Sequence, residues 1–177
     1  MPWRWVNVPI PEAHLAALGV GALLHDALPV RVPIGRSPAV LAGWSLVTGG
    51  VALGAWAVAS ASAADVEVDR PAQLVRSGAY RVSRNPMYLA WSLGHLGLGL
   101  LTRSGWILLG SALATVAVHR DVAEEEASLA AAFGADYDAY RAEVPRYLPL
   151  TSGLSSVASA HRMKGRNVNR RRSNRDA

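Results

Sequence analysis

A short basic stretch and a run of glutamates hold the side chains of this 177-residue chain that could do chemistry. The basic stretch, SGAYRVSRNPMY at residues 77–88, is interrupted by glycine and proline and lies between long apolar runs. Arg76 precedes it, and Arg81 and Arg84 lie within it. Arginines at a membrane border can simply bind anionic headgroups. The stretch therefore indicates a ligand site only if a second group faces it.

The second group is a set of three consecutive glutamates, Glu124, Glu125 and Glu126. They lie in a segment with helical periodicity, where Val122, Glu126 and Leu129 share one face. Glu125 borders that face, whereas Glu124 lies off it. A solvated acidic helix start would give the same composition, but a carboxylate on an apolar face needs a partner. We expect Glu125 and Glu126 to lean toward the apolar side.

Composition places most of the chain in a bilayer. Hydrophobic residues make up 51% and charged residues only 18%, against about 25% charged in an average soluble domain. The chain has no cysteine, which excludes disulfides, a thiol nucleophile and cysteine-type zinc sites.

Four apolar segments predict four membrane spans. The clearest is 37–64, which has no charged residue and is long enough for one tilted helix. Residues 85–119 form a second apolar run, and a predicted turn at 102–105 divides it into a tight hairpin of two short spans. Residues 13–30 are the weakest candidate, with a helix lying on the membrane surface as the alternative.

Small residues within the predicted spans indicate close helix packing. Gly50 and Gly54 form a GxxxG pattern, and Gly94 and Gly97 lie in the next apolar segment. Such residues let helix backbones approach closely in lipid. His95 is expected to face the interior of the bundle, as polar residues at that depth usually do.

The C-terminal part changes character. Residues 120–144 are charged, alanine-rich and helical in period, and Gly134 is a plausible break between two short helices. Residues 1–151 are predicted to form one domain and 152–177 a disordered tail. The tail is basic: residues 161–177 carry a net charge of +6, whereas the rest of the chain carries −1.

Charge distribution predicts the orientation of the bundle. With four spans, both termini, the segment 65–84 and the glutamates lie on one side. That side carries most of the arginines, so the positive-inside rule predicts that it faces the cytoplasm. The bundle itself is expected in the inner membrane of the cell.

The two motif segments resemble a known superfamily. GAYRVSRNPMYLAW, followed by EEEASLAAAFGADYDAYRAEVPRYLP, is similar to the isoprenylcysteine carboxyl methyltransferase and phospholipid methyltransferase superfamily. Its pattern is G-x-Y-x-x-x-R-H-P-x-Y, a helical hairpin, then E-E-x-x-L, F-G, Y-x-x-Y and V-P-x-x-L-P. The resemblance runs from about Leu74 to Pro149, and the ordered set of motifs is more specific than any one of them.

The resemblance implies an integral membrane methyltransferase that uses S-adenosylmethionine. It implies an all-α, multi-pass membrane helix bundle in which short C-terminal cytoplasmic helices close a cofactor pocket. Arg84 and Arg120 become candidates for the substrate side, and no metal ligand or catalytic residue is assigned. The implied cofactor-binding residues are Gln73, Leu74, Val75, Tyr80, Asn85, Pro86, Met87, Tyr88, Glu125 and Glu126.

Two departures from the pattern concern the acceptor. The usual histidine is Asn85 here, and asparagine does not titrate near neutral pH. The prenylcysteine enzymes place an arginine four residues before the first motif glutamate, and that position is Asp121. Both departures argue against a prenylcysteine carboxylate as the substrate.

The expected function is methyl transfer to a lipophilic or membrane-associated acceptor with a carboxylate, amine or similar nucleophile. A sulfonium donor is already activated, so positioning and exclusion of water would carry most of the rate gain. The alternatives are an NADPH-dependent reductase of the sterol-reductase-like type and a non-catalytic membrane protein that keeps the fold. The expected partners are the lipid bilayer, a lipophilic acceptor and, for the tail, anionic headgroups, with no specific nucleic acid.

Overall fold

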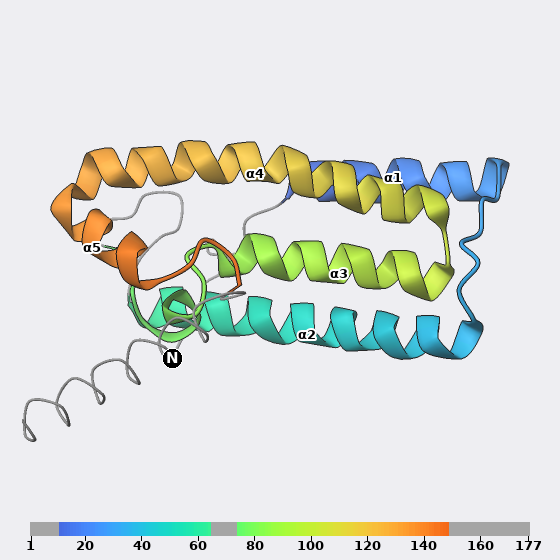
Figure 1. Ribbon diagram of the computed structural model, residues 1–177, viewed down its shortest axis with the longest axis horizontal. Coiled ribbons are helices and arrows are strands. Elements are labelled where there is room, and N and C mark those ends of the chain that lie inside the picture. Colours follow the sequence, from blue (N-terminus) through green and yellow to red (C-terminus); the bar gives the residue numbers. More distant parts are fainter. Residues whose placement is uncertain (1–10, 65–73, 149–177) are drawn as a thin grey trace, which may run out of the picture. The chain divides into compact units, whose positions relative to one another are not determined.

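The computed structural model describes residues 11–64 and 74–148, and within these ranges it is helical (Figure 1). The compact unit ends at Tyr147, and residues 148–177 form a second unit. The predicted domain boundary at 151, the basic tail and Gln73 lie outside the described residues. The elements are α1 (Glu12–Ala27), α2 (Arg36–Ala63), the 3-10 helix η2 (Gly78–Arg81), α3 (Pro86–Thr102), α4 (Gly105–Phe133) and α5 (Ala135–Glu143).

The four long helices form an antiparallel bundle, with α3 in the centre. Helix α2 packs along α3, and α1 packs along α4 and also contacts α3. Helices α1 and α3 run in one direction, and α2 and α4 run in the other (Figure 1). The end of α2, the start of α3 and the charged end of α4 therefore lie together. This end carries both motif segments.

The opposite end of the bundle is closed by two connections that pair with each other. Arg103 has a left-handed φ of 53°, and the Ser104 hydroxyl accepts a hydrogen bond from the Ile107 N–H at 3.3 Å. The Gly105 N–H donates to the carbonyl of Val30 at 2.8 Å, which ties the α1–α2 connection to this turn. The predicted turn at 102–105 is confirmed, and the N-cap serine explains where α4 begins.

Helices α2 and α3 approach closely because both present glycine at the contact. A Cβ added to Gly50 would lie 2.7 Å from the Ala90 carbonyl oxygen, and one added to Gly97 would lie 2.8 Å from that of Gly43. His95 is 2% exposed. The predicted packing role of Gly50 and Gly97 and the interior position of His95 are confirmed.

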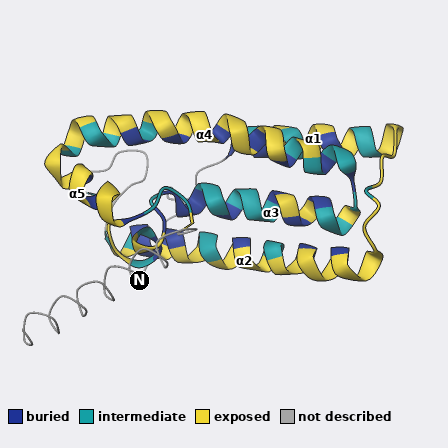
Figure 2. Cartoon of the chain, viewed as in Figure 1, coloured by how far each residue is buried: buried dark blue, intermediate teal, exposed yellow. Residues whose placement is uncertain are grey.

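The outer faces of the bundle are exposed (Figure 2), and large apolar side chains lie on them. Leu41 and Val51 on α2 and Leu113 on α4 are each more than half exposed. Helices α2 and α4 are long and apolar enough to cross a membrane. Helices α1 and α3 have 16 and 17 residues and would each extend about 25 Å, slightly less than a hydrocarbon core of about 30 Å. The number of spans stays a prediction.

Helix α4 differs from its expected boundaries. Residues 120–133, expected to form a separate short helix, continue the second helix of the hairpin without interruption. No proline or glycine follows Gly110 until Gly134, and alanine, glutamate and leucine are good helix formers. At 29 residues the helix is about 43 Å long, so its charged end extends beyond the apolar part. Gly134, with φ 49°, ends α4 as predicted.

The close contact of α2 with α3 gives a testable prediction. Gly50→Ala forces a methyl group against the Ala90 carbonyl and should destabilise the protein by about 1–3 kcal/mol. Its neighbour Gly49 has nothing within 4 Å of an added Cβ, so Gly49→Ala should be neutral or stabilising, since alanine favours the helix. Thermal unfolding in detergent measures both, and equal midpoints would contradict the contact.

Candidate functional site

A buried carboxylate organises the end of the bundle that carries the motifs. Glu126 is 8% exposed. Its Oε1 accepts hydrogen bonds from Arg84 Nε at 3.1 Å and Asn85 Nδ2 at 2.9 Å. Its Oε2 accepts from Arg84 Nη2 at 3.1 Å and from Arg146 Nε and Nη2 at 3.1 and 2.9 Å. Charge-assisted bonds of this kind are the strong ones, and they provide the partner that a buried carboxylate requires.

Arg84 reaches beyond Glu126 to the C-terminal end of α5. Its Nη1 donates to the carbonyls of Arg141 at 3.0 Å and Val144 at 2.7 Å. Its backbone N–H donates to the Pro145 carbonyl at 2.9 Å. These carbonyls lie at or beyond the end of α5, where helix carbonyls have no partner within the helix. Arg84 therefore fastens residues 144–147, the closing segment that follows α5, to the start of α3.

Arg146 completes this arrangement from the C-terminal side. Its carbonyl accepts hydrogen bonds from the Ser83 hydroxyl at 3.1 Å and Asn85 Nδ2 at 3.3 Å. The hydrogen bond to Glu126 raises the pKa of the Arg146 guanidinium, opposed by partial burial. Sequence reasoning used the V-P-x-x-L-P motif but assigned no role to Arg146. The signal in the sequence was the expected position of Glu126 on an apolar face, because a buried carboxylate needs cationic partners. Arg146 is one of the two arginines that fill this role.

The basic stretch is also anchored on α2. Gly78 has φ 58°, and an added Cβ would lie 2.0 Å from the Ser60 hydroxyl oxygen. That hydroxyl accepts a hydrogen bond from the Ala79 N–H at 3.1 Å. Only glycine fits this left-handed, crowded position, which explains why the motif begins with it. Ala79 and Met87 pack with Ala57 in a small apolar core.

Tyrosines of α5 cover the other side of the stretch. Tyr137 and Tyr140 form an apolar cluster in which Leu74 is partly buried. The Tyr140 hydroxyl donates to the Tyr80 carbonyl at 2.7 Å, and Arg76 forms an ion pair with Asp136 at 3.5 Å. The two tyrosines of the Y-x-x-Y motif, Tyr137 and Tyr140, thus hold the basic stretch against α5. The sequence analysis did not assign this role to them.

Glu125 has a different setting from Glu126. It is only partly buried and accepts a hydrogen bond from the Tyr88 hydroxyl. Burial and the nearby Glu125 carboxylate raise the pKa of Tyr80 to about 12, so this phenol stays protonated at neutral pH. His119 and Tyr147 lie on the same end of the bundle, joined by a hydrogen bond of 2.9 Å. Glu125, Tyr80 and Tyr88 form an acidic and aromatic group whose side chains are each partly exposed.

The structure brings most of the predicted site residues together. Glu126 is buried, Glu125 partly buried and Glu124 exposed, which confirms the predicted facing. Arg84, predicted on the substrate side, uses its guanidinium for Glu126 and two carbonyls. Arg120 is exposed. Ligand binding by any of these residues stays a prediction. Those placed around the Glu126 end of the bundle are Leu74, Val75, Tyr80, Asn85, Pro86, Met87 and Tyr88.

Comparison with known proteins identifies the family of this chain. The sequence profile of the phospholipid methyltransferase family matches residues 38–136. The chain belongs to the phospholipid methyltransferase family. The matched range contains α3, α4 and all but the first two residues of α2, with Asn85, Glu125 and Glu126, and the resemblance inferred from the motifs is confirmed.

One curated relative shows the same relationship. The chain is 35% identical over 82 residues to the protein-S-isoprenylcysteine O-methyltransferase of Xenopus laevis. The match covers 46% of this chain and 28% of that relative's length. No solved structure matches. Family membership supports a membrane methyltransferase, consistent with the all-α bundle and its two long apolar helices.

The Glu126 cluster leads to a stability prediction. Glu126→Gln removes the charge that two guanidinium groups share and should destabilise the protein by about 3–5 kcal/mol, as when one partner of a buried ion pair is lost. Glu124→Gln, on the exposed face of the same helix, should change stability by less than about 0.5 kcal/mol. Thermal unfolding in detergent compares the two, and similar midpoints would show that the cluster does not hold the site.

Proposed function

We propose that the protein transfers a methyl group from S-adenosylmethionine to a lipophilic acceptor at the membrane surface. The observation that carries this proposal is the placement of Glu125, a partly exposed carboxylate beside Tyr80 and Tyr88. These three residues lie at the end of the bundle that the hydrogen bonds of Glu126 hold together. The whole arrangement lies within the part of the chain that matches the phospholipid methyltransferase family.

The two glutamates are suited to different roles. Glu126 forms ion pairs with Arg84 and Arg146 and is suited to hold the start of α3 against the closing segment. Glu125 is the carboxylate suited to accept hydrogen bonds from the cofactor's amino or ribose groups. The rings of Tyr80 and Tyr88 are suited to stack on the adenine or to face the positive sulfonium.

The residues present fit this cofactor. The carboxylate of Glu125 and the rings of Tyr80 and Tyr88 match a ligand with a cationic centre and an aromatic base. The start of α3 adds backbone N–H groups that lack helical partners. When bound, S-adenosylmethionine supplies an activated methyl group, and the role left to this chain is to align the acceptor and exclude water. Asn85 donates to Glu126 and so contributes to positioning.

Charge placement supports a cytoplasmic site. Arg76, Arg81 and Arg84 belong to the motif end of the bundle, whereas Arg31 and Arg103 belong to the opposite end. By the positive-inside rule the motif end faces the cytoplasm, where soluble nucleotide-type cofactors are found. The inner membrane and binding of the basic tail to anionic headgroups are parts of the same proposal.

Two experiments test the proposal against its alternatives. Isothermal titration of the purified full chain with S-adenosylmethionine should give saturable binding, whereas titration with NADPH should not. Transfer of a labelled methyl group to a membrane lipid extract should give a labelled lipid. Binding of NADPH in place of S-adenosylmethionine would favour the reductase, and binding of neither by a folded sample would favour a non-catalytic protein.

The division between the glutamates gives a further prediction. Glu125→Gln should weaken S-adenosylmethionine binding by about 10- to 100-fold, the loss expected for a charge-assisted hydrogen bond. Glu124→Gln should leave affinity unchanged because that side chain is exposed on another face. Titration measures both dissociation constants, with unfolding as the check on folding. Equal affinities would mean that Glu125 does not face the cofactor.

A further inference from the structure

A histidine and a tyrosine at the motif end of the bundle form a hydrogen-bonded pair that the proposed cofactor site does not use. His119, on α4, has its Nδ1 atom 2.9 Å from the hydroxyl oxygen of Tyr147, in the closing segment. The two ring centroids lie 5.9 Å apart, with the ring planes tilted by 45°. Tyr147 is half-buried, whereas His119 is exposed. The pair therefore connects the covered side of this end of the bundle with its surface.

The antiparallel hairpin of α3 and α4 places His119 at the level of the candidate site. The hydroxyl oxygens of Ser92 on α3 and Thr115 on α4 lie 3.4 Å apart. Four residues nearer the motif end, the corresponding positions are Tyr88 on α3 and His119 on α4. Residues four apart lie on the same side of a helix. His119 therefore lies at the level of Tyr88, on the side of α4 from which Thr115 reaches α3.

Tyr147 reaches the same level from the closing segment. It lies within electrostatic range of Tyr88 and of Glu126, and its neighbour Arg146 is bonded to Glu126. Burial raises the pKa of the Tyr147 hydroxyl, although Arg146 opposes the shift. The phenol therefore keeps its hydrogen at neutral pH and donates it to the lone pair of His119 Nδ1. The Tyr147 oxygen keeps its own lone pairs for a second partner.

The other polar groups of the site are less suited to take up a proton. The Asn85 amide does not titrate near neutral pH and donates to Glu126. Glu126 is paired with two arginines, and Glu125 accepts a hydrogen bond from Tyr88. Histidine is the side chain that ordinarily changes its charge between about pH 5 and 8. His119 is therefore the group best suited to store a proton among the described residues of this end.

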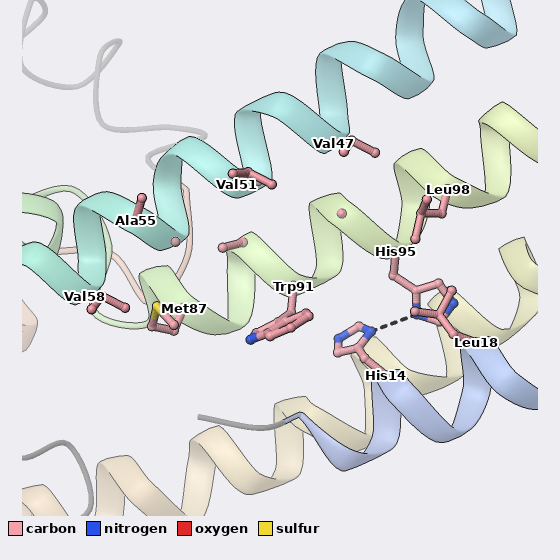
Figure 3. Close-up of a pocket in the computed structure, with 14 residues that line it drawn as sticks. His14, Leu18, Val47, Val51, Ala55, Val58, Met87, Trp91, His95 and Leu98 are labelled. Carbon is pink, nitrogen blue, oxygen red and sulfur yellow. Dashed lines mark hydrogen bonds between the residues drawn. The ribbon is translucent and has the colours of Figure 1, made fainter. Parts of the chain in front are cut away.

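The other histidines that the structure describes lie away from this end. His14 and His95 are buried between α1 and α3, and their Nδ1 atoms lie 2.9 Å apart (Figure 3). His14 Nε2 also lies 3.3 Å from the Ser92 hydroxyl, so these two rings hold α1 against α3. His25 is in the last turn of α1, at the opposite end of the bundle.

We propose that Tyr147 and His119 together take up the proton that the methyl acceptor loses. This inference rests on the proposed methyl transfer. It adds that the acceptor's nucleophilic atom carries a proton, as an amine or a hydroxyl does and a carboxylate at neutral pH does not. Tyr147 is the catalytic residue, because its hydroxyl oxygen meets that proton. His119 acts through Tyr147 and is a positioning residue that stores the charge.

In this step the lone pair of the acceptor's nucleophilic atom forms the new bond to the methyl carbon. The bond between that carbon and sulfur breaks, and its electron pair stays on sulfur. The acceptor's proton passes to the Tyr147 oxygen while the Tyr147 hydrogen passes to His119 Nδ1, which leaves an imidazolium. Because His119 is exposed, it can return the proton to water after turnover.

The surroundings of His119 carry both signs of charge, and no ion pair to His119 lies among the described residues. Its pH dependence should therefore be that of one group coupled to Tyr147. The other titratable and charged groups on the elements packed around it are Arg146 of the closing segment, Tyr88 of α3, Glu12 of α1, and Arg120 and Asp121 of α4 itself.

A pH profile of methyl transfer tests the proposal. With labelled S-adenosylmethionine and a membrane lipid extract, the wild-type kcat should rise between about pH 5 and 8, because only the neutral imidazole takes up the proton. His119→Gln keeps a hydrogen-bonding side chain and Tyr147→Phe keeps the ring. Each should lower kcat about 100-fold or more and lose this rise with pH, while the affinity for S-adenosylmethionine stays that of wild type.

The matched control is His25→Gln, which removes a histidine at the opposite end of the bundle and should keep both the rate and the profile. Rescue separates proton transfer from packing. His119→Ala should regain rate on addition of imidazole, whereas Tyr147→Phe should not. Thermal unfolding in detergent checks that each variant is folded.

The outcomes separate this inference from the proposed function. Methyl transfer with unchanged kcat in both His119→Gln and Tyr147→Phe would overturn the inference alone. Loss of rate in His119→Ala without rescue by imidazole would assign the pair to holding the closing segment and overturn its role in proton transfer. A wild-type rate that does not change across the pH range in which histidine titrates would also overturn it. Absence of methyl transfer by wild type at every pH would overturn the proposed function, and the inference with it.

Discussion

The buried Glu126 carboxylate is the interaction on which the site depends. It joins three segments that lie far apart in the sequence, through Arg84 before α3, its own helix α4, and Arg146 after α5. A carboxylate at this depth carries a large desolvation cost. Five hydrogen bonds from two guanidinium groups and from Asn85 offset that cost. The geometry is therefore strongly directional, and it fixes where the start of α3 meets the closing segment.

The length of α4 makes this cluster possible. Its apolar part packs in the bundle, while its charged end continues as one rigid helix beyond the apolar part. Glu125 and Glu126 sit on that extension and are carried by the same backbone that packs against α1 and α3. A site built on a rigid helix is positioned more accurately than one on a loop. Because one helix carries both parts, the packing of α4 in the bundle also sets the positions of Glu125 and Glu126.

Several features could be predicted from local sequence because local physics decides them. The facing of Glu125 and Glu126 follows from helical periodicity, and the turn at 102–105 follows from turn-forming residues between apolar runs. The close contact at Gly50 follows from the GxxxG pattern. The continuation of α4 past residue 119 was missed. The change from apolar to charged residues there predicts a helix boundary, but no residue at that point breaks a helix.

The sequence by itself determined the apolar helices, the order of the motifs and the family, because these depend on residue type and spacing along one chain. Only the tertiary structure decided which glutamate pairs with two arginines and which lies partly exposed beside Tyr88. It also decided that Arg84 serves the closing segment and that His14 meets His95 across two helices. Hydrogen bonds between residues more than 40 positions apart depend on how helices align in space, and no spacing within one helix encodes that alignment.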